Sequence, residues 1–478
     1  MVFNSFIFWV IFPLIFLVYW IIPKRFNTAR KIWLLMVSYL LYLNWNPFFS
    51  LVLLYVTAVT YFGAISISSK FDKRRKKALI ICLAVLTLIP LLAFKYYNFL
   101  NDNITALMVS ADIKFSLPGL NWAVPVGISF FTFQALGYMF DVYRDKIEPE
   151  RNLADYMLFC SFFPQTASGP ISKAGELLPQ FKKEREFRFS DGAQGLKYVL
   201  WGIFLKCFVA DRLGLYVDTV FSNYQHFSAL NCFWASVLFS LQIYGDFAGY
   251  SLMAVGIAKT LGFDLINNFR RPYFADSITN FWRRWHISLT RWLTEHVYIP
   301  LGGSRCSKPK QYANIMTTFL VSGLWHGANW TFIVWGGIHG IAQIVEKHLG
   351  IDPKGRHAGK AWYKKTKVIR IIITFLVVTF AWIIFRMPTI GDAYELIARI
   401  FSGEGSQPFM YKASNSDKML TFLAIALLFA AELRGEYLRS RTTWLDRPWA
   451  RWSIYVGIFC IILCMGVLDA SSFIYVNF

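Results

Sequence analysis

Residues 315–338 read IMTTFLVSGLWHGANWTFIVWGGI, an apolar run whose single ionisable side chain is His326. About 20 mostly apolar residues are needed to cross the hydrocarbon core of a membrane, and runs of this kind recur along the chain. We predict spans near residues 5–22, 32–46, 48–68, 78–99, 122–140, 194–221, 231–262, 312–328, 330–347, 369–386, 417–432 and 452–472. The sequence therefore predicts an all-α, polytopic membrane protein with about 11–13 transmembrane helices.

The composition excludes an ordinary soluble protein. Hydrophobic residues make up 56% of the 478 residues and charged residues only 16%, whereas soluble chains carry about 25% charged residues. The net charge of +21 comes from basic residues in short loops between the apolar runs, where such residues set the orientation in the membrane. We therefore expect membrane lipid around the chain and no nucleic-acid partner.

The basic residues are unevenly distributed between alternate loops, and this asymmetry predicts the orientation. The basic stretches are 23–31, 70–77, 264–310, 347–370 and 433–451. In contrast, loop 100–121 holds only Lys114, and loop 222–230 holds no lysine or arginine. Because positively charged loops stay in the cytoplasm, we expect the N-terminus and the segment 387–416 to lie outside.

No internal repeat and no flexible linker divides the chain, which argues against a solenoid or a repeat-built transporter. We expect a single membrane domain over residues 1–478, with its core at 120–350. The C-terminal helices at 369–478 would carry the external segment 387–416.

Several familiar catalytic motifs are missing from the sequence. None of the seven cysteines forms a C-x-x-C pair, so no zinc site or disulfide framework is indicated. The chain also lacks a G-x-S-x-G elbow, a P-loop and an H-E-x-x-H helix, which argues against serine-hydrolase, NTPase and zinc-protease chemistry. We expect no metal and no permanently bound cofactor.

The position of His326 favours proton-transfer chemistry inside the membrane. A neutral imidazole can be buried in apolar surroundings and still accept a proton from a hydroxyl, so His326 is a candidate general base. Gly323 and Gly327 would allow close backbone approach, and Trp325 and Asn329 are candidates to line a substrate channel. The alternative is a structural histidine held by packing.

Two apolar stretches, 154–180 and 278–300, are interrupted by Pro, Gly or charge, so we expect re-entrant or interfacial helices there. In the second stretch, an apolar helical stripe is formed by Trp282, Trp285, Leu289 and Trp292. Off this stripe lie Arg283, Arg284 and Arg291. These arginines would either anchor an amphipathic helix to lipid headgroups or dock an anionic donor.

His286 follows Trp285 in the same stretch. Taken alone, it is either an ordinary helix histidine or a second catalytic group. Trp285 is a candidate to line the channel beside it.

A carboxylate lies within the apolar segment 241–251, together with the candidate channel residues Gln242 and Tyr244. Asp246 in mid-membrane must face the protein interior or a wet cavity and pair with a donor. It is either a structural hydrogen-bond node or a group beside the active site. Upstream, a second charge cluster is formed by Lys206, Asp211 and Arg212.

Several of these motifs, in this order, resemble the membrane-bound O-acyltransferase family, in particular its branch of bacterial alginate O-acetylation proteins. The motifs are DFAGYS at 246–251, FWRRWHISL at 281–289, YIPLGG at 298–303, GLWHGA at 323–328 and WGGIHG at 335–340. The segments FPQ at 163–165, SGPI at 168–171 and LLPQ at 177–180 resemble the same branch. The similarity runs from about residue 3 to residue 350.

This resemblance implies an integral membrane enzyme with a tunnel, in which a cytoplasmic thioester donor meets a hydroxyl reached from outside. His326 matches the family's active-site histidine, and His286 matches the second polar position of bacterial members. We expect transfer of an acetyl or other short acyl group, from acetyl-coenzyme A or an acyl-carrier protein, toward a cell-surface polysaccharide. The resemblance further implies a bacterial inner-membrane location and a periplasmic SGNH-type acetyltransferase or another secretion-complex subunit as partner.

Two other functions stay open at this stage. The same chemistry could move D-alanine to teichoic acid, or a longer acyl group to a lipid or protein. A glycan transporter or flippase would instead use a charged pathway through Asp246, Lys206, Asp211 and Arg212, although the absence of repeats argues against it.

Overall fold

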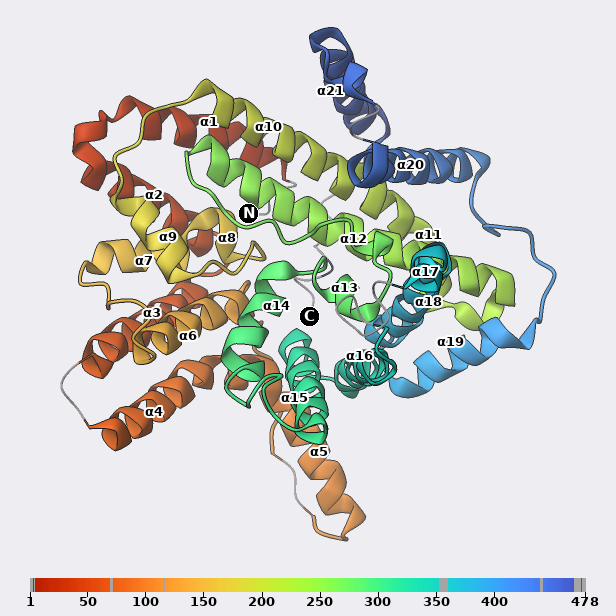
Figure 1. The fold of residues 1–478 in the computed structure, drawn as a ribbon, viewed down its shortest axis with the longest axis horizontal. Coiled ribbons are helices and arrows are strands. Elements are labelled where there is room, and N and C mark those ends of the chain that lie inside the picture. Colours follow the sequence, from red (N-terminus) through yellow and green to blue (C-terminus); the bar gives the residue numbers. More distant parts are fainter. Residues whose placement is uncertain are drawn as a thin grey trace. The chain divides into compact units, whose positions relative to one another are not determined.

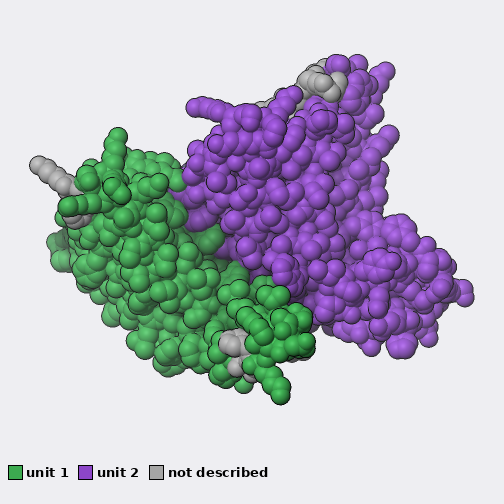
Figure 2. Space-filling model, turned by 90° about the horizontal axis from the view of Figure 1, so that it is seen from below, with its two compact units in different colours: residues 1–196, 254–266 green, residues 197–253, 267–478 purple. Residues whose placement is uncertain are grey.

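The computed structural model describes residues 3, 5–68, 72–114, 117–351, 360–438, 442–467 and 474. These residues form helices joined by turns, and no strand occurs among them. The all-α prediction is therefore confirmed. The chain divides into two compact units, one of residues 1–196 and 254–266 and the other of residues 197–253 and 267–478 (Figure 2). The core predicted at residues 120–350 coincides with neither of these two units and stays a prediction.

The first unit contains the N-terminal helices (Figure 1). They are α1 (Phe6–Ile21), α2 (Asn27–Leu43), α3 (Pro47–Ile67), α4 (Lys73–Leu91), α5 (Tyr97–Ser110), α6 (Ile128–Tyr143), α7 (Leu153–Ser161), α8 (Phe163–Thr166) and α9 (Ala174–Lys182). The start of α3 follows from its sequence, because the side chain of Asn46 accepts the N–H of Phe48 and Pro47 takes the first helical position. The stretch 154–180 forms the short helices α7 to α9, as expected of a segment interrupted by Pro and Gly.

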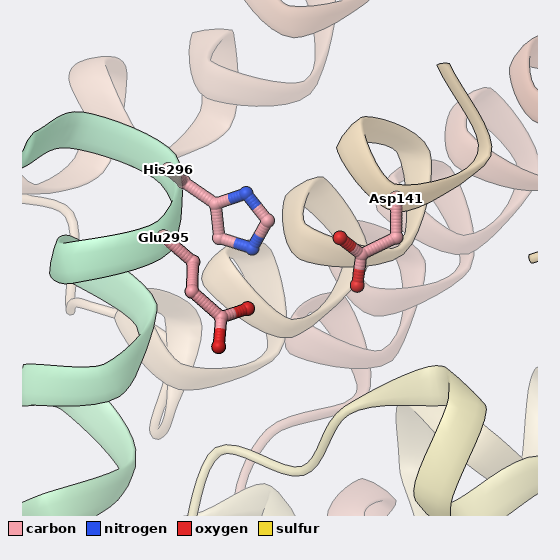
Figure 3. A group of neighbouring side chains, drawn as sticks. All are labelled: Asp141, Glu295 and His296. Atoms are coloured by element: carbon pink, nitrogen blue, oxygen red, sulfur yellow. The ribbon is translucent and has the colours of Figure 1, made fainter. Parts of the chain in front are cut away.

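Two helices run from one unit into the other, namely α10 (Phe189–Ile203) and α12 (Ala229–Thr260). The second unit continues with α11 (Asp211–Ser222), α13 (Ile278–Trp282), α14 (Ile287–Leu293), α15 (Lys308–His326), α16 (Trp330–Leu349), α17 (Ala361–Lys365), α18 (Lys367–Arg386), α19 (Ile390–Ser402), α20 (Asn415–Leu433) and α21 (Pro448–Met465). Two π-helical turns matter for the site, η3 (Phe204–Ala210) and η6 (Thr294–Tyr298). Glu295 and His296 project from η6 as neighbouring side chains, whereas Asp141, drawn with them, belongs to α6 of the first unit (Figure 3).

Four helical segments of the described chain are long and apolar enough to cross a membrane. They are Pro47–Ile67, Lys73–Ser110, Lys367–Arg386 and Pro448–Met465. The segments Ile7–Ile21 and Lys24–Leu43 pass the same test together, with a bend of 107° between them. The predicted number of crossings stays a prediction, and the end of the last predicted span, 468–472, lies outside the described residues.

Helices α15 and α16 pack backbone against backbone through two glycines. A Cβ added to Gly323 of α15 or to Gly336 of α16 would lie 2.3 Å from a carbonyl oxygen of the other helix. Only glycine permits this approach. His326 follows the first glycine by three residues, and His339 follows the second by three residues. The two histidines therefore belong to one tightly packed helical hairpin.

Residues 278–293 form two short helices, α13 and α14, although the apolar stripe by itself indicates a single amphipathic helix. The break falls at residues 283–286, and His286 adopts φ 43° and ψ 54°, which is the left-handed region. Asn268 stabilises the new start, because its backbone oxygen accepts the N–H of Ile287 at 2.9 Å and its side-chain oxygen accepts the N–H of Ser288 at 3.1 Å. These bonds satisfy N–H groups that a helix start leaves without partners.

The apolar stripe survives this break. Its four side chains, Trp282, Trp285, Leu289 and Trp292, are all buried. Each of the two short helices therefore turns its aromatic residues toward the protein interior.

Candidate active site

His326 is the last residue of α15, and its side chain is buried. Aromatic rings surround the imidazole. The ring centres of Trp325 and Trp335 both lie 5.0 Å away, and that of Phe385 from α18 lies 5.4 Å away. A histidine in such apolar surroundings can accept a proton from a hydroxyl group, as a general base does.

His286 lies in the same aromatic cluster. Its side chain is wholly buried, with the ring of Phe247 from α12 at 4.7 Å and the ring of Trp325 at 5.7 Å between centres. Trp325 therefore contacts both His286 and His326. The structure brings together two histidines that lie forty residues apart in the sequence, and the positive φ of His286 is the kind of strained backbone often found at functional sites.

Trp285 also belongs to this cluster. It is wholly buried, and its ring centre lies 4.9 Å from that of Phe269 and 5.1 Å from that of Trp382. Trp382 in turn lies 5.6 Å from Trp335, which contacts His326. The predicted channel residues Trp285 and Trp325 are thus both close to the histidines.

Asp246 pairs with a donor, as predicted for a carboxylate in an apolar helix. Lys206 of η3 places its ammonium 2.7 Å from an oxygen of Asp246 and 2.7 Å from an oxygen of Asp211. The second oxygen of Asp246 accepts the N–H of Ile474 at 2.8 Å. Because Phe247 follows Asp246 and packs on His286, this buried network fixes the helix that supports the site. Of the two alternatives for Asp246, these contacts favour the structural hydrogen-bond node.

Three other predicted channel residues have distinct surroundings. The hydroxyl of Tyr244 donates to the carboxylate of Glu432 from α20 at 3.0 Å, and its ring lies 6.3 Å from that of Trp285. Gln242 is buried one helical turn before Asp246. Asn329 caps α16, since its side-chain oxygen accepts the N–H of Thr331 at 3.0 Å and its amide donates to the carbonyl of Pro388 at 2.8 Å. Both polar atoms of the Asn329 side chain are thus engaged in hydrogen bonds within the protein.

The three predicted docking arginines differ in their contacts. Arg283 is exposed. Arg284 instead forms an ion pair with Glu436 at 3.0 Å and donates to the side-chain oxygen of Asn280 at 3.2 Å. Arg291 lies 3.5 Å from Glu295 in the next helical turn. These contacts leave Arg283 as the arginine best placed to meet a ligand.

A cavity of about 290 Å³ lies within the second unit, between α13, α14 and η6 on one side and α15 and α16 on the other. Its polar lining is Thr279, Arg283, Thr290, Thr294, Tyr298, Thr318, Ser322, Gln343 and Lys347. Its apolar lining is Trp282, Leu289, Leu293, Ile315 and Phe319. Ser322 precedes His326 by one helical turn, so the cavity approaches the buried histidine along α15. Two cations, several hydroxyls and an apolar wall suit an elongated ligand that carries both anionic and amide groups.

Two further residues near the site make contacts that the sequence does not predict. Asn268 holds the start of α14 next to His286, as described above. His339, which the sequence leaves as either an ordinary helix histidine or a pore-lining group, is wholly buried and accepts a hydrogen bond at Nδ1 from the indole of Trp282 at 3.3 Å. Both depend on contacts between residues far apart in the chain, so no local pattern reveals them.

Comparison with known proteins identifies the family. Residues 145–388 match the model of the MBOAT, membrane-bound O-acyltransferase family. A probable alginate O-acetylase AlgI of Azotobacter vinelandii is 35% identical over 434 residues, which cover 90% of this chain and 83% of that protein. A peptidoglycan O-acetyltransferase of Helicobacter pylori is 33% identical over 394 residues, which cover 77% of this chain and 73% of that protein.

A more distant relative transfers a different group, according to its name. The teichoic acid D-alanyltransferase of Streptococcus thermophilus is 29% identical over 283 residues, which cover 54% of this chain and 68% of that protein. The matched segment 145–388 contains His286, His326, His339 and the whole cavity. The chain belongs to the membrane-bound O-acyltransferase family and is a multi-pass membrane acyltransferase.

Proposed function

We propose that this protein moves an acetyl or other short acyl group from a cytoplasmic thioester donor toward hydroxyl groups of a cell-surface polysaccharide. The observation that carries the proposal is the position of His326, buried in an aromatic cluster one helical turn from the end of the lined cavity. The names of the relatives, an alginate O-acetylase and a peptidoglycan O-acetyltransferase, support a polysaccharide acceptor and an acetyl group.

In this proposal His326 is the general base. It accepts the proton of the acceptor hydroxyl while the oxygen attacks the carbonyl carbon of the thioester. The tetrahedral intermediate then collapses, the carbon–sulfur bond breaks, and the proton passes from His326 to the leaving sulfur. His286 positions the hydroxyl or polarises the thioester carbonyl. The surrounding tryptophans and phenylalanines exclude water and so suppress hydrolysis of the donor.

The cavity would hold the arm of the thioester donor. Arg283 and Lys347 line it and supply positive charge for the phosphate of coenzyme A or of an acyl-carrier protein. Thr290, Thr318 and Gln343 supply hydrogen-bond groups for the amides of such an arm. The donor is a substrate, and no permanently bound cofactor or metal is required.

The proposed setting is the inner membrane of a bacterium, with the N-terminus and the segment 387–416 outside. An acyl group delivered at that side would pass to the polysaccharide directly or through an SGNH-type acetyltransferase or another secretion-complex subunit. Membrane lipid surrounds the apolar helices, and no nucleic acid takes part.

D-alanyl transfer to teichoic acid is the second candidate, and the Streptococcus thermophilus relative supports it. The lower identity and the coverage of about half of this chain favour acetyl transfer. Transfer of a longer acyl group to a lipid or protein is a third candidate. The transporter alternative falls away, because the chain is an acyltransferase.

The proposal can be tested with purified protein in lipid vesicles. Acetyl-coenzyme A, acetyl-loaded carrier protein and D-alanyl-loaded carrier protein are offered separately, each with alginate or peptidoglycan fragments as acceptors. We expect acetyl esters on the polysaccharide. Transfer of D-alanine alone would favour the second candidate, and transfer from none of the thioesters would contradict both.

A further inference from the structure

His339 of α16 uses one ring nitrogen within the protein and leaves the other without an acceptor. Nδ1 accepts the indole N–H of Trp282 at 3.3 Å. Because a neutral imidazole carries one proton, that proton must lie on Nε2, which is then a donor. The side chain is wholly buried, and Nε2 has no hydrogen-bond partner among the residues that the structure describes.

A buried donor without an acceptor destabilises a folded protein, so native structures retain few of them. Packing alone does not account for a histidine here. The rings of Phe281 and Phe319 stack on His339 at 6.3 and 6.2 Å between centres, and a phenylalanine would make the same contacts. The Nε2–H donor is therefore available to an acceptor atom of a ligand.

His339 contacts both a residue that lines the cavity and a residue that contacts His326. On one side it binds Trp282, whose indole lines the cavity. On the other side the ring of Trp335 lies 5.0 Å from His339 and 5.0 Å from His326. His339 is thus linked to the cavity through Trp282 and to His326 through Trp335.

We propose that the Nε2–H of His339 donates a hydrogen bond to the carbonyl oxygen of the thioester donor. This inference rests on the proposed function. When the acceptor hydroxyl attacks, the carbonyl electron pair moves onto that oxygen, and the hydrogen bond strengthens as the negative charge develops. Collapse of the intermediate re-forms the carbonyl and breaks the carbon–sulfur bond. His339 keeps its proton throughout and acts only as a fixed donor.

Two substitutions distinguish the role of Nδ1 of His339 from that of Nε2. In His339→Asn the side-chain oxygen can replace Nδ1 and accept from Trp282, but no donor reaches the position of Nε2. In His339→Gln the amide nitrogen can replace Nε2 as a donor. His348→Asn is the matched control, because it makes the same change on an exposed histidine of the same helix.

We expect His339→Asn to lower kcat by about 100-fold, the size found for one lost oxyanion donor, with the KM for the thioester unchanged. His339→Gln should recover at least part of kcat, and His348→Asn should match the parent. Melting temperature and folded yield of all variants are measured together with the kinetics. A fall in yield with unchanged kcat per folded molecule, or equal kcat in the Asn and Gln variants, would overturn the assignment.

His326→Ala, measured in parallel, separates this inference from the proposed function. Loss of transfer in His326→Ala with full kcat in His339→Asn would overturn only the role of His339. Full transfer in His326→Ala would overturn the proposed mechanism on which that role depends.

Discussion

Gly336 of α16 packs directly on Gly323 of α15, so closely that a Cβ on Gly336 would lie 3.4 Å from the Cα of Gly323. The same Cβ would lie 2.3 Å from the carbonyl oxygen of Phe319, which is far inside van der Waals contact. This crossing fixes the hairpin that carries His326 and His339. The geometry of the site therefore depends on two residues that have no side chain.

We predict that Gly336→Ala destabilises the protein and lowers acyl transfer, because the helices must separate to admit the methyl group. The expected loss is about 1–3 kcal/mol in the free energy of unfolding, measured in detergent. Gly457→Ala in α21 is the control, since no atom lies within 4 Å of its added Cβ. There alanine should be neutral or stabilise the helix by up to about 1 kcal/mol. Equal stability of the two variants would contradict the close packing at Gly336.

The buried network around Lys206 yields a second prediction. Removal of its ammonium in Lys206→Met leaves Asp211 and Asp246 buried without their shared cation, which should cost about 3–5 kcal/mol. The comparison is Lys24→Met, which removes an ion pair with Glu186 in which both side chains are more than half exposed and should change the stability little. Thermal unfolding of both variants in the same detergent measures the difference. A Lys206→Met variant as stable as the parent would rule out a structural role for this network.

Arg283 and Arg284 should respond differently to charge reversal, although they are neighbours in the sequence. Arg283 lines the cavity, so Arg283→Glu should raise the KM for an anionic thioester and weaken its dependence on salt. Arg284 pairs with Glu436, so Arg284→Glu should lower folded yield instead. Donor KM at low and at physiological salt is measured with folded yield for each variant. If Arg284→Glu alone raised the KM, the assignment of the docking arginine would be reversed.

The orientation in the membrane can be tested by cysteine labelling with an impermeant reagent in intact cells, on a background without the exposed Cys82, Cys460 and Cys464. Single cysteines at 72–77 or 360–367 should be protected, and those at 103–112 or 403–415 should be labelled. The predicted cytoplasmic positions 70, 71 and 354–359 lie outside the described residues. The opposite labelling pattern would contradict this orientation and would place the donor side outside and the acceptor side in the cytoplasm.

The sequence predicts those parts of the fold and site that depend on local pattern. Apolar runs give the helices, and the rule that a carboxylate in an apolar helix needs a donor predicts that Asp246 is paired. Its partner, Lys206, is known only from the structure. The break between α13 and α14 is not predicted, because the apolar stripe continues through it while Asn268 caps the second helix from a distant segment. The hydrogen bond from Trp282 to His339 is not predicted for the same reason, since the two residues lie 57 positions apart in the chain.

The central claim is that His326 removes the proton from the acceptor hydroxyl. Its most direct test is the rate of acyl transfer by His326→Gln, compared with the parent protein and with His348→Gln, at saturating thioester in lipid vesicles. We predict transfer at least 100-fold slower in His326→Gln, because a general base contributes about 10²–10⁴-fold, with donor KM and melting temperature close to those of the parent. His348→Gln should keep the parent rate. Parent-like transfer by His326→Gln would contradict the account.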